Sequence, residues 1–344
     1  MRKVRLGKTE LMVSEIAFGG IPIQRLSHDD AVAVVREVLD MGVNFIDTAH
    51  GYTTSEEMIG EAIRDLPRDS LILASKSPAS DRDGFMRDLE LSLRRLNVEY
   101  IDIYQHHNVS GDEKMSAVLG PGGAWEGMQE ALKSGLIRHP AFSAHSLETA
   151  EKMMRTGNYE VIQLPFNFVD DAASQLHVPL ARELDMGFIC MKPLGGGLLD
   201  DARLCFRYLR QFEGIVPDPG IEASDQMREI LEVYSDDSAL SPSELAAIEA
   251  TKRSLGTSWC HRCDYCQPCP QNIRISTVLS ARSMTRRMPL GRARQILDPT
   301  MEAAATCIEC GLCVERCPYD LAVPELLKER QGQYAGFLET GLWQ

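Results

Sequence analysis

Eight short apolar runs, each followed by a stretch with helical spacing, restrict the fold of this chain more than any other feature. The helical stretches carry apolar residues three and four positions apart, as within 31–39. The apolar runs lie at residues 14–20, 44–49, 71–76, 101–107, 137–145, 161–167, 187–194 and 214–220. Strands that alternate with helices in this number predict an α/β fold in which a parallel sheet closes as a (β/α)₈ TIM barrel.

An open, doubly wound sheet is the alternative to a barrel. It is disfavoured because no GxGxxG motif follows the first run and because the runs reach the number that a barrel needs. Residues 241–254 read SPSELAAIEATKRS, which predicts a helix with a capping-box start. We therefore expect a barrel at residues 1–240, a linker helix at 241–258 and a separate domain at 259–344.

Most of the cysteines occur in two runs near the end of the chain. The first run is C-x2-C-x2-C-x2-C-P, with Cys260, Cys263, Cys266 and Cys269. The second is C-x2-C-x2-C-x3-C-P, with Cys307, Cys310, Cys313 and Cys317. In bacterial two-cluster ferredoxins the first three cysteines of such a run hold one cluster and the fourth, before proline, ligates the other.

This spacing predicts two [4Fe–4S] clusters with crossed ligation. One cluster takes Cys260, Cys263, Cys266 and Cys317, and the other takes Cys307, Cys310, Cys313 and Cys269. Two structural zinc sites are the alternative, but zinc usually binds separated CxxC pairs and fits consecutive triplets poorly. The other two cysteines, Cys190 and Cys205, lie in a predicted strand and a predicted helix and are interpreted as core thiols.

The interval between the cysteine runs, 270–306, is too long for the hairpin of a compact two-cluster ferredoxin. Residues 273–284 and 291–306 have the pattern of helices, and 323–330 has the pattern of a closing helix. The second domain is therefore expected to be small, α-helical and ferredoxin-like.

Polar side chains stand where three consecutive apolar runs end. Asp47 ends the second run and Tyr52 follows in its loop, Lys76 ends the third, and His106 and His107 end the fourth. Active sites of barrels gather at the C-terminal ends of the strands, and consecutive strands are neighbours, so these side chains are expected to converge. Because side chains alternate along a strand, only one of the two histidines can face the site.

Three of these segments resemble the Asp, Tyr, Lys and His tetrad of the aldo-keto reductases: DTAHGY at 47–52, LASK at 73–76 and DIYQHH at 102–107. The opening RLGKTELMVSEIAFGG is similar to the N-terminal signature of that family. Together with the cysteine runs, the chain resembles the iron–sulfur branch of the family, which adds a ferredoxin-like domain to the barrel. The resemblance implies that Asp47, Tyr52, Lys76 and His107 are catalytic.

The implied reaction is NAD(P)H-dependent hydride transfer that interconverts a small carbonyl compound and an alcohol. Tyr52 would donate the proton, although a free tyrosine, with a pKa near ~10, is a weak acid at neutral pH. An adjacent ammonium favours the phenolate, so Lys76 would tune Tyr52, and Asp47 would hold Lys76 charged. His107 would orient the carbonyl, and His106 would be a packing residue.

The resemblance also implies a set of contacts to the nicotinamide cofactor. Ser143 and Gln163 would face the carboxamide, Met191 would lie against the ring, and Lys192 would lie near the pyrophosphate. The full implied set is Ser143, Gln163, Met191, Lys192, Leu194, Gly195, Gly197, Gly220, Gln226 and Glu229. The glycine-rich stretch 191–197 follows the seventh run, where barrels commonly bind phosphate and where glycine lets backbone N–H groups approach an anion.

The segment that would meet a 2′-phosphate is acidic. NADPH-using members of the family carry basic residues where this chain has Gly220 and Gln226, and Arg228 is the only cation within 218–229. Like charge opposes a phosphate, so NADH is slightly favoured over NADPH.

Composition excludes some classes of function. The net charge of −14 argues against nucleic acid as a partner, since phosphate binding needs a basic face. No apolar stretch of about 18 residues occurs, so no membrane span is expected. Ten cysteines without a signal-peptide pattern predict reduced thiols and a cytoplasmic location.

A second function class remains open: an electron-transfer protein in which the barrel is a docking scaffold. In a third possibility, the clusters have only a structural role and stabilise the C-terminal domain. The interval 270–306 is rich in arginine and could form a docking face for an acidic redox protein. The alternative is that these arginines are solvated helix surface or pair with the acidic barrel. Its arginines are Arg274, Arg282, Arg286, Arg287, Arg292 and Arg294.

Overall fold

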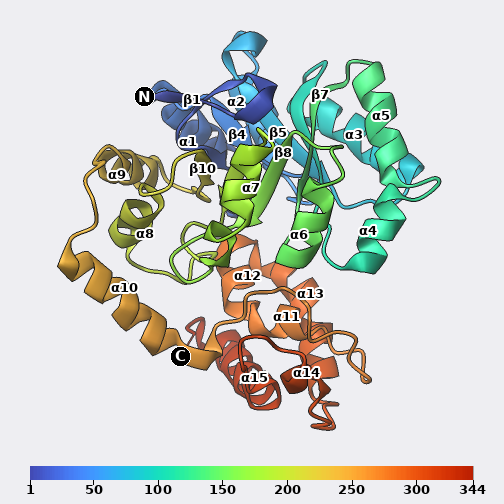
Figure 1. Cartoon of the computed structure of the whole chain (residues 1–344), viewed down its shortest axis with the longest axis vertical. Helices are drawn as coiled ribbons and strands as arrows, with labels where there is room; N and C mark the ends of the chain where they lie inside the picture. The colour runs from blue at the N-terminus through green and yellow to red at the C-terminus, as the bar shows by residue number, and fades with distance from the viewer. Residues whose placement is uncertain (344) are drawn as a thin grey trace. The chain divides into compact units, whose positions relative to one another are not determined.

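The computed structural model describes residues 1–343 and divides into two compact units, Met1–Leu240 and a second that starts at Ser241. The first unit, blue to yellow-green in Figure 1, contains the parallel strands. The second, orange to red, is helical.

Eight parallel strands form one sheet in the order of the sequence. They are β3 (Phe18–Gly19), β4 (Phe45–Asp47), β5 (Ile72–Ser77), β6 (Ile101–His106), β7 (Ile137–Ser143), β8 (Val161–Pro165), β9 (Gly187–Met191) and β10 (Ile215–Asp218). A parallel bridge between Gly19 and Gly220 joins the first of these strands to the segment after the last. The Gly19 amide donates to Pro219 O at 2.9 Å there, so the sheet is nearly closed and the predicted barrel is confirmed.

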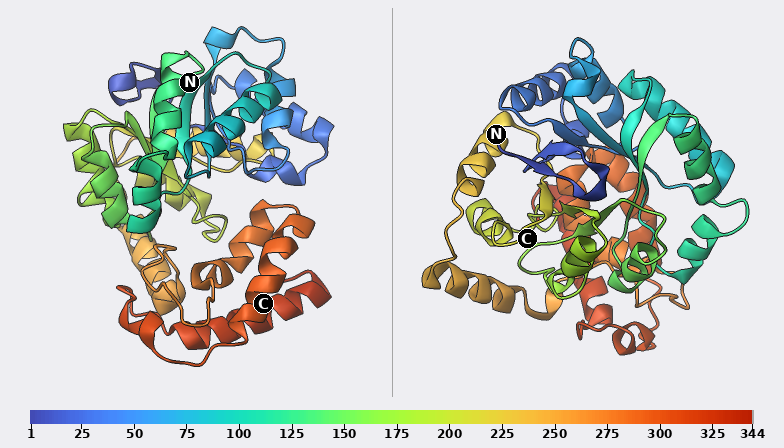
Figure 2. Two further views of the ribbon diagram at one scale, coloured as in Figure 1. Left: turned by 90° about the vertical axis from the view of Figure 1, so that its right-hand side faces the viewer. Right: turned by 45° about the horizontal axis from the view of Figure 1, so that its top comes forward.

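Helices surround the strands, as the right-hand view of Figure 2 shows. They are α1 (His28–Asp40), α2 (Ser55–Ile63), α3 (Arg82–Leu96), α4 (Asp112–Leu119), α5 (Ala124–Lys133), α6 (Leu147–Met154), α7 (His177–Glu183), α8 (Ala202–Leu209) and α9 (Ser224–Tyr234). Several begin with a side-chain N-cap: the Ser27 side chain accepts from Asp30 N in α1, and Asp81 accepts from Gly84 N in α3.

The interior of the barrel is packed with apolar side chains. Each strand after β3 contributes to this layer, for example Phe45 from β4, Ile103 from β6 and Val216 from β10, and all three are buried. Leu6 and Val13 belong to the same cluster and come from a hairpin that the sequence did not predict, β1 (Lys3–Arg5) with β2 (Met12–Ser14). The first expected run, 14–20, is therefore divided between the end of this hairpin and the short strand β3.

The second unit begins with α10 (Pro242–Leu255), which has the predicted capping box. Ser241 Oγ accepts from Glu244 N, and Glu244 Oε2 accepts from Ser241 N at 2.7 Å. The later helices are α11 (Ile275–Leu279), α12 (Ala281–Arg287), α13 (Leu290–Ala304), α14 (Leu312–Glu315) and α15 (Val323–Thr340). Where one helix was expected at 273–284 there are two, separated at Ser280, whose hydroxyl bonds back to Ser276 O at 2.7 Å.

The helices of the second unit pack on a core of their own. Val278, Leu297 and Leu327 are among its buried residues, and six of the eight clustered cysteines pack against it. The thiols are therefore held by a folded scaffold rather than by a loose terminal tail.

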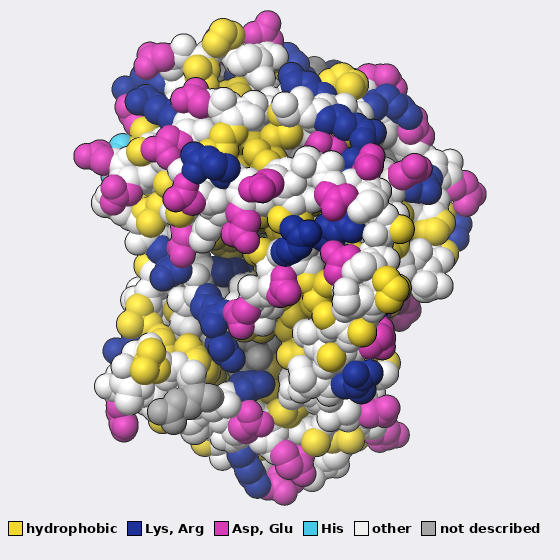
Figure 3. Space-filling model, turned by 90° about the vertical axis from the view of Figure 1, so that its left-hand side faces the viewer, with side chains coloured by type: hydrophobic (Ala, Val, Ile, Leu, Met, Phe, Trp, Pro, Cys, Tyr) yellow, Lys and Arg dark blue, Asp and Glu magenta, His cyan; other side chains and the backbone are white. Residues whose placement is uncertain are grey.

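Within residues 1–343, no helix combines the length and apolar character needed to cross a membrane. On the face drawn in Figure 3, acidic and basic side chains are interspersed.

Candidate functional site

The polar residues at the mouth of the barrel follow from the alternation of side chains along each strand. Phe45, Ala74 and Ile103 belong to the apolar interior, and the residues two positions later face the same way. In strand order these later residues are Asp47, Lys76, Gln105, Ser143, Gln163, Met191 and Asp218. The C-terminal ends of the strands thus form a mostly polar layer directly above an apolar one.

Asp47 and Lys76 form a buried ion pair at the centre of this layer. Lys76 Nζ lies 2.5 Å from Asp47 Oδ2 and donates to Thr48 O at 2.7 Å, and both side chains are almost fully buried. Burial acts to lower the pKa of Lys76, but attraction to Asp47, to which the ionised forms of Tyr52 and Asp218 would add, outweighs it and raises the pKa of the ammonium. Lys76 is therefore a permanent cation at neutral pH.

Tyr52 lies near both this cation and a histidine. The Lys76 ammonium lies 5.4 Å from the centroid of the Tyr52 ring, and the Tyr52 and His107 rings meet edge to face at 5.9 Å. Both rings are partly buried. The structure brings together all four residues of the expected tetrad: Asp47, Tyr52, Lys76 and His107.

His106 points the other way, into an aromatic box outside the strands. Its ring lies 5.1 Å from that of Phe85 and 5.8 Å from that of Tyr159, and neither of its ring nitrogens has a hydrogen-bond partner within residues 1–343. Burial, assisted by the charge of Lys114, lowers the pKa of His106 to about 3. His106 is thus a neutral core residue.

Two polar residues of the layer were not predicted as site residues. Gln105 Nε2 donates to Asp47 Oδ1 at 3.3 Å, and Asp218 Oδ2 accepts from Gln163 Nε2 at 3.0 Å. Gln163 Nε2 also lies 3.2 Å from Asp47 Oδ2. The signal for both was present in the sequence, since each stands two positions beyond an inward-facing apolar residue of its strand.

Asp218 is the more unusual of the two, because it adds a second carboxyl group to the buried site. Its pKa is raised well above the ordinary range by burial first and then by the charge of Asp47. Lys76 and Gln163 act in the opposite direction and do not outweigh these causes.

The residues expected to meet the nicotinamide fall around this layer. Ser143 is buried and its Oγ accepts from Asn108 N at 2.9 Å, so the hydroxyl proton can still be donated. Gln163 Oε1 is a buried acceptor without a partner in the described chain. Met191 ends β9 and is half-buried. These three side chains belong to the neighbouring strands β7, β8 and β9.

The glycine-rich loop follows at once. Lys192 has a φ of 57°, and its ammonium lies 3.2 Å from His145 Nδ1. Gly195 and Gly197 have φ values of 59° and 85°, which glycine adopts without strain. Their amides bond within the loop, to Lys192 O and Leu194 O at 2.9 Å each. The turn is tight, and the side chain of Lys192 is its positive group.

The segment after β10 holds the remaining expected contacts. Gly220 is exposed and lies where a Cβ atom would approach Pro22 Cγ to 2.8 Å. Gln226 closes a capping interaction at the start of α9, where its Oε1 accepts from Glu222 N at 3.0 Å, and Glu229 is exposed on α9. Arg228 is ion-paired with Asp225.

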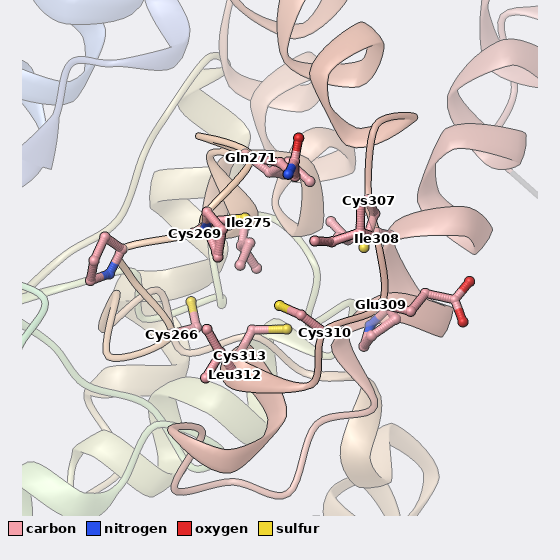
Figure 4. Close-up of a pocket in the computed structure, with 15 residues that line it drawn as sticks. Cys266, Cys269, Gln271, Ile275, Cys307, Ile308, Glu309, Cys310, Leu312 and Cys313 are labelled. Carbon is pink, nitrogen blue, oxygen red and sulfur yellow. The ribbon is translucent and has the colours of Figure 1, made fainter.

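The clustered thiols line two separate hollows of the second unit. One is bordered by Cys266, Cys269, Cys307, Cys310 and Cys313, and the other by Cys260, Cys263, Cys266 and Cys317. Each hollow thus contains one of the two predicted ligand sets, including the cysteine contributed by the distant run. In Figure 4 the thiols of Cys310 and Cys313 turn toward the same space.

The donor set suits a multi-iron cluster. Within residues 1–343, no three His, Cys, Asp or Glu side chains converge closely enough for a single metal ion. The thiols surround spaces instead, which is what a cubane with a cysteine at each corner requires. Burial raises the pKa of the Cys260 thiol to about 11 and that of Cys266 to about 12, so cluster assembly would release their protons.

Comparison with known proteins agrees with both units. The model of the aldo/keto reductase family matches residues 15–248, and the model of a 4Fe-4S dicluster domain matches residues 259–322. The chain belongs to the aldo/keto reductase family.

Individual relatives are distant. L-galactose dehydrogenase of Arabidopsis thaliana is 29% identical over 218 residues, which is 57% of this chain and 66% of that protein. A Glycine max protein named "Probable aldo-keto reductase 1" is 26% identical over 215 residues, 57% of this chain and 60% of its own length. The chain therefore spans less than two thirds of the length of these relatives.

Solved structures share the fold. An aldo-keto reductase of Bacillus halodurans in its holo form has a TM-score of 0.63 at 22% identity, covering 73% of this chain and 96% of that one. An aldo/keto reductase of Klebsiella pneumoniae, solved in complex with NADP and acetate, has a TM-score of 0.62 at 23% identity, covering 73% and 95%.

Proposed function

We propose that the barrel catalyses hydride transfer between a nicotinamide cofactor and a small carbonyl compound, in either direction, beside a two-cluster iron–sulfur domain. The observation that carries the proposal is that the Tyr52 ring lies 5.4 Å from a buried ammonium and 5.9 Å from the His107 ring. Such a phenol is a positioned general acid, which the reduction of a carbonyl requires.

The residues of the site have separate tasks. A bound reduced nicotinamide would supply the hydride. Tyr52 donates its proton to the oxygen of the substrate as negative charge develops there, and Lys76 stabilises the phenolate that remains. Asp47 holds Lys76 in place through the 2.5 Å ion pair, and His107 orients the carbonyl oxygen toward Tyr52.

The cofactor contacts are proposed because the side chains are complementary to the groups of a nicotinamide cofactor. The partner-free oxygen of Gln163 matches the amide donor of a nicotinamide, and the hydroxyl of Ser143 matches its carbonyl acceptor. Met191 would lie against the ring, and Lys192 would meet the pyrophosphate at the loop that contains Leu194, Gly195 and Gly197.

We further propose that NADH binds at least as well as NADPH. Gly220 and Glu229 offer no cation to a 2′-phosphate, and Gln226 is engaged in capping α9. The nearby arginines are neutralised, because Arg228 pairs with Asp225 and Arg25 lies 2.9 Å from Glu222. Direct titration with both cofactors tests this, and a clear preference for NADPH would contradict it.

The function itself is tested with Tyr52→Phe. After anaerobic purification, wild-type protein should oxidise NADH in the presence of members of an aldehyde and ketone panel. The variant should lose about 10²- to 10⁴-fold of this activity, as is typical for a positioned acid, while its affinity for NADH stays nearly the same. A variant with wild-type turnover would exclude Tyr52 as the proton donor.

For the second unit we propose two [4Fe–4S] clusters with crossed ligation. Cys317 would complete the cluster held by Cys260, Cys263 and Cys266, and Cys269 would complete the cluster of the second run. The hollows support this assignment, because each is bordered by the cysteine that arrives from the other run.

An electron-transfer role is a second candidate, and one feature favours it. Cys310 is exposed, and Ile308, two positions before it, is 61% exposed. One predicted cluster would therefore lie close to the protein surface, next to an exposed apolar side chain that a partner could contact. A nicotinamide gives up two electrons as hydride whereas a cluster passes one, and the chain has no flavin signature to join them. NADH alone should therefore not bleach the clusters, and rapid bleaching without a partner would show that they are coupled to the barrel.

A further inference from the structure

A second carboxyl group contacts the Asp47–Lys76 pair. Asp218 ends β10 with its side chain buried, close to the same amide group that contacts Asp47. One amide nitrogen of Gln163 donates to both carboxyl groups, at 3.2 Å to Asp47 and 3.0 Å to Asp218. Two buried carboxyl groups that share one amide nitrogen repel each other when both are ionised, so a proton on one of them is favoured.

The surroundings determine which of the two groups carries the proton. Asp47 accepts from the Lys76 ammonium at 2.5 Å and from Gln105 at 3.3 Å, whereas Asp218 accepts only from Gln163 within residues 1–343. The site holds one cation for two carboxyl groups, and a second buried negative charge costs several kcal/mol. These contacts favour a proton on Asp218 rather than on Asp47.

Besides the amide of Gln163, the titratable groups that face Asp218 come from three strands. A charge on Asp218 would repel Asp47 of β4. It would also oppose ionisation of the Cys190 thiol of β9, whose pKa is raised by burial first, then by Asp218 and Cys205. Lys76 of β5 is the one attractive charge. Ionisation of Asp218 would add negative charge to a site in which Tyr52 must itself become negative.

We propose that Asp218 is a positioning residue of the active site, whose neutral carboxyl group holds the Gln163 amide that it shares with Asp47 and leaves Asp47 as the sole partner of Lys76 among the two carboxyl groups. The consequence for catalysis rests on the proposed function, because it acts through Lys76 on Tyr52. The proton on Asp218 does not: it is a property of the folded barrel.

Infrared difference spectroscopy tests the proton directly. Spectra of the full chain at neutral pH, wild type minus Asp218→Asn, should show the carbonyl band of a protonated carboxylic acid. The matched control is Asp102→Asn, which removes a buried carboxylate held by Arg68 at 2.5 Å and should leave that band in place. The proposal is overturned if wild type shows no such band, or if the band persists in Asp218→Asn.

Kinetics test the positioning. Asp218→Val removes the hydrogen bond to Gln163. Its kcat should fall about 10- to 100-fold and its KM should change less, because a catalytic group is misplaced. In wild type, ionisation of Asp218 at high pH should also lower kcat, which we call the alkaline decline. Asp218→Asn has the shape of the neutral acid and cannot ionise, so it should recover most of the loss and should lack the alkaline decline.

The two failures are distinguishable. If Asp218→Asn is as damaged as Asp218→Val, or keeps the alkaline decline, the positioning role is wrong. If wild type itself reduces no carbonyl compound, the proposed function fails, while the infrared band still decides whether Asp218 carries a proton.

Discussion

Replacement of Lys76 by methionine probes the central electrostatic argument of the site. Methionine keeps most of the length and apolar stem of lysine but removes the ammonium from its place 5.4 Å from the Tyr52 ring centroid. At this distance, and at an effective dielectric constant of about 20, an ammonium and a phenolate attract by about 3 kcal/mol. That energy corresponds to a rate reduction of about 100- to 200-fold.

The single variant also leaves Asp47 as a buried charge without its cation, which destabilises the fold. A double variant, Asp47→Asn with Lys76→Met, removes both charges and should recover stability without recovering activity. Lys114→Met is the matched control, because Lys114 bonds Pro78 O and Ser80 Oγ at 2.6 Å each and takes no part in the tetrad.

The assay is single-turnover oxidation of bound NADH by a reactive aldehyde, with unfolding followed in parallel. Single turnover separates the chemical step from cofactor release. If both Lys76 variants retain turnover within about tenfold of wild type, a difference of about 1.4 kcal/mol, the charge of Lys76 does not act on Tyr52 and the reasoning is refuted.

Three further predictions concern stability and cluster ligation. Burial lowers the pKa of His106 from 6.5 to about 3, so its contribution to stability is complete above pH 6.5 and is lost as the pH falls from 6.5 toward 3. His106→Phe should therefore lose less stability than wild type over this pH range, and an unchanged pH profile of unfolding would contradict the burial argument. Burial raises the pKa of Asp218 above 3.8, so its contribution to the free energy of unfolding is complete at low pH and is lost as the pH rises. Calorimetry should show that Asp218→Asn unfolds at a higher temperature than wild type at neutral pH but not at pH 3.8. Wild type should contain ~8 iron and ~8 sulfide per chain, and Cys317→Ala should lose about half of each, whereas zinc in place of iron would exclude clusters.

Much of the fold was predictable because its signals are local. Eight apolar runs and the helical spacing between them specify strands and helices, and their regular order leaves a closed parallel sheet as the simplest arrangement. The N-terminal hairpin was missed because its strands have three residues each and bury few side chains, so no alternating pattern is visible. The break at Ser280 was missed because a hydroxyl that bonds back to the helix has no signature in apolar spacing.

The tetrad was accessible from sequence because Asp47, Lys76 and His107 stand at the ends of consecutive strands, and the closure of the barrel brings such ends together. The cysteine runs were accessible because cluster ligation depends on spacing along the chain. Gln105 was within reach of the same alternation rule, two positions beyond Ile103, but its type alone does not indicate a site.

What the sequence alone determined is the set of groups: one lysine, one tyrosine, a histidine and eight clustered thiols at positions dictated by strand ends and motif spacing. What only the tertiary structure decided is their electrostatic state. Asp218 read as one of several acids in a negative segment, and it became a neutral partner of Asp47 only when closure of the barrel removed both from water beside a single cation. Charge in a protein depends on burial and on neighbours in space, and neither is written in the order of the residues.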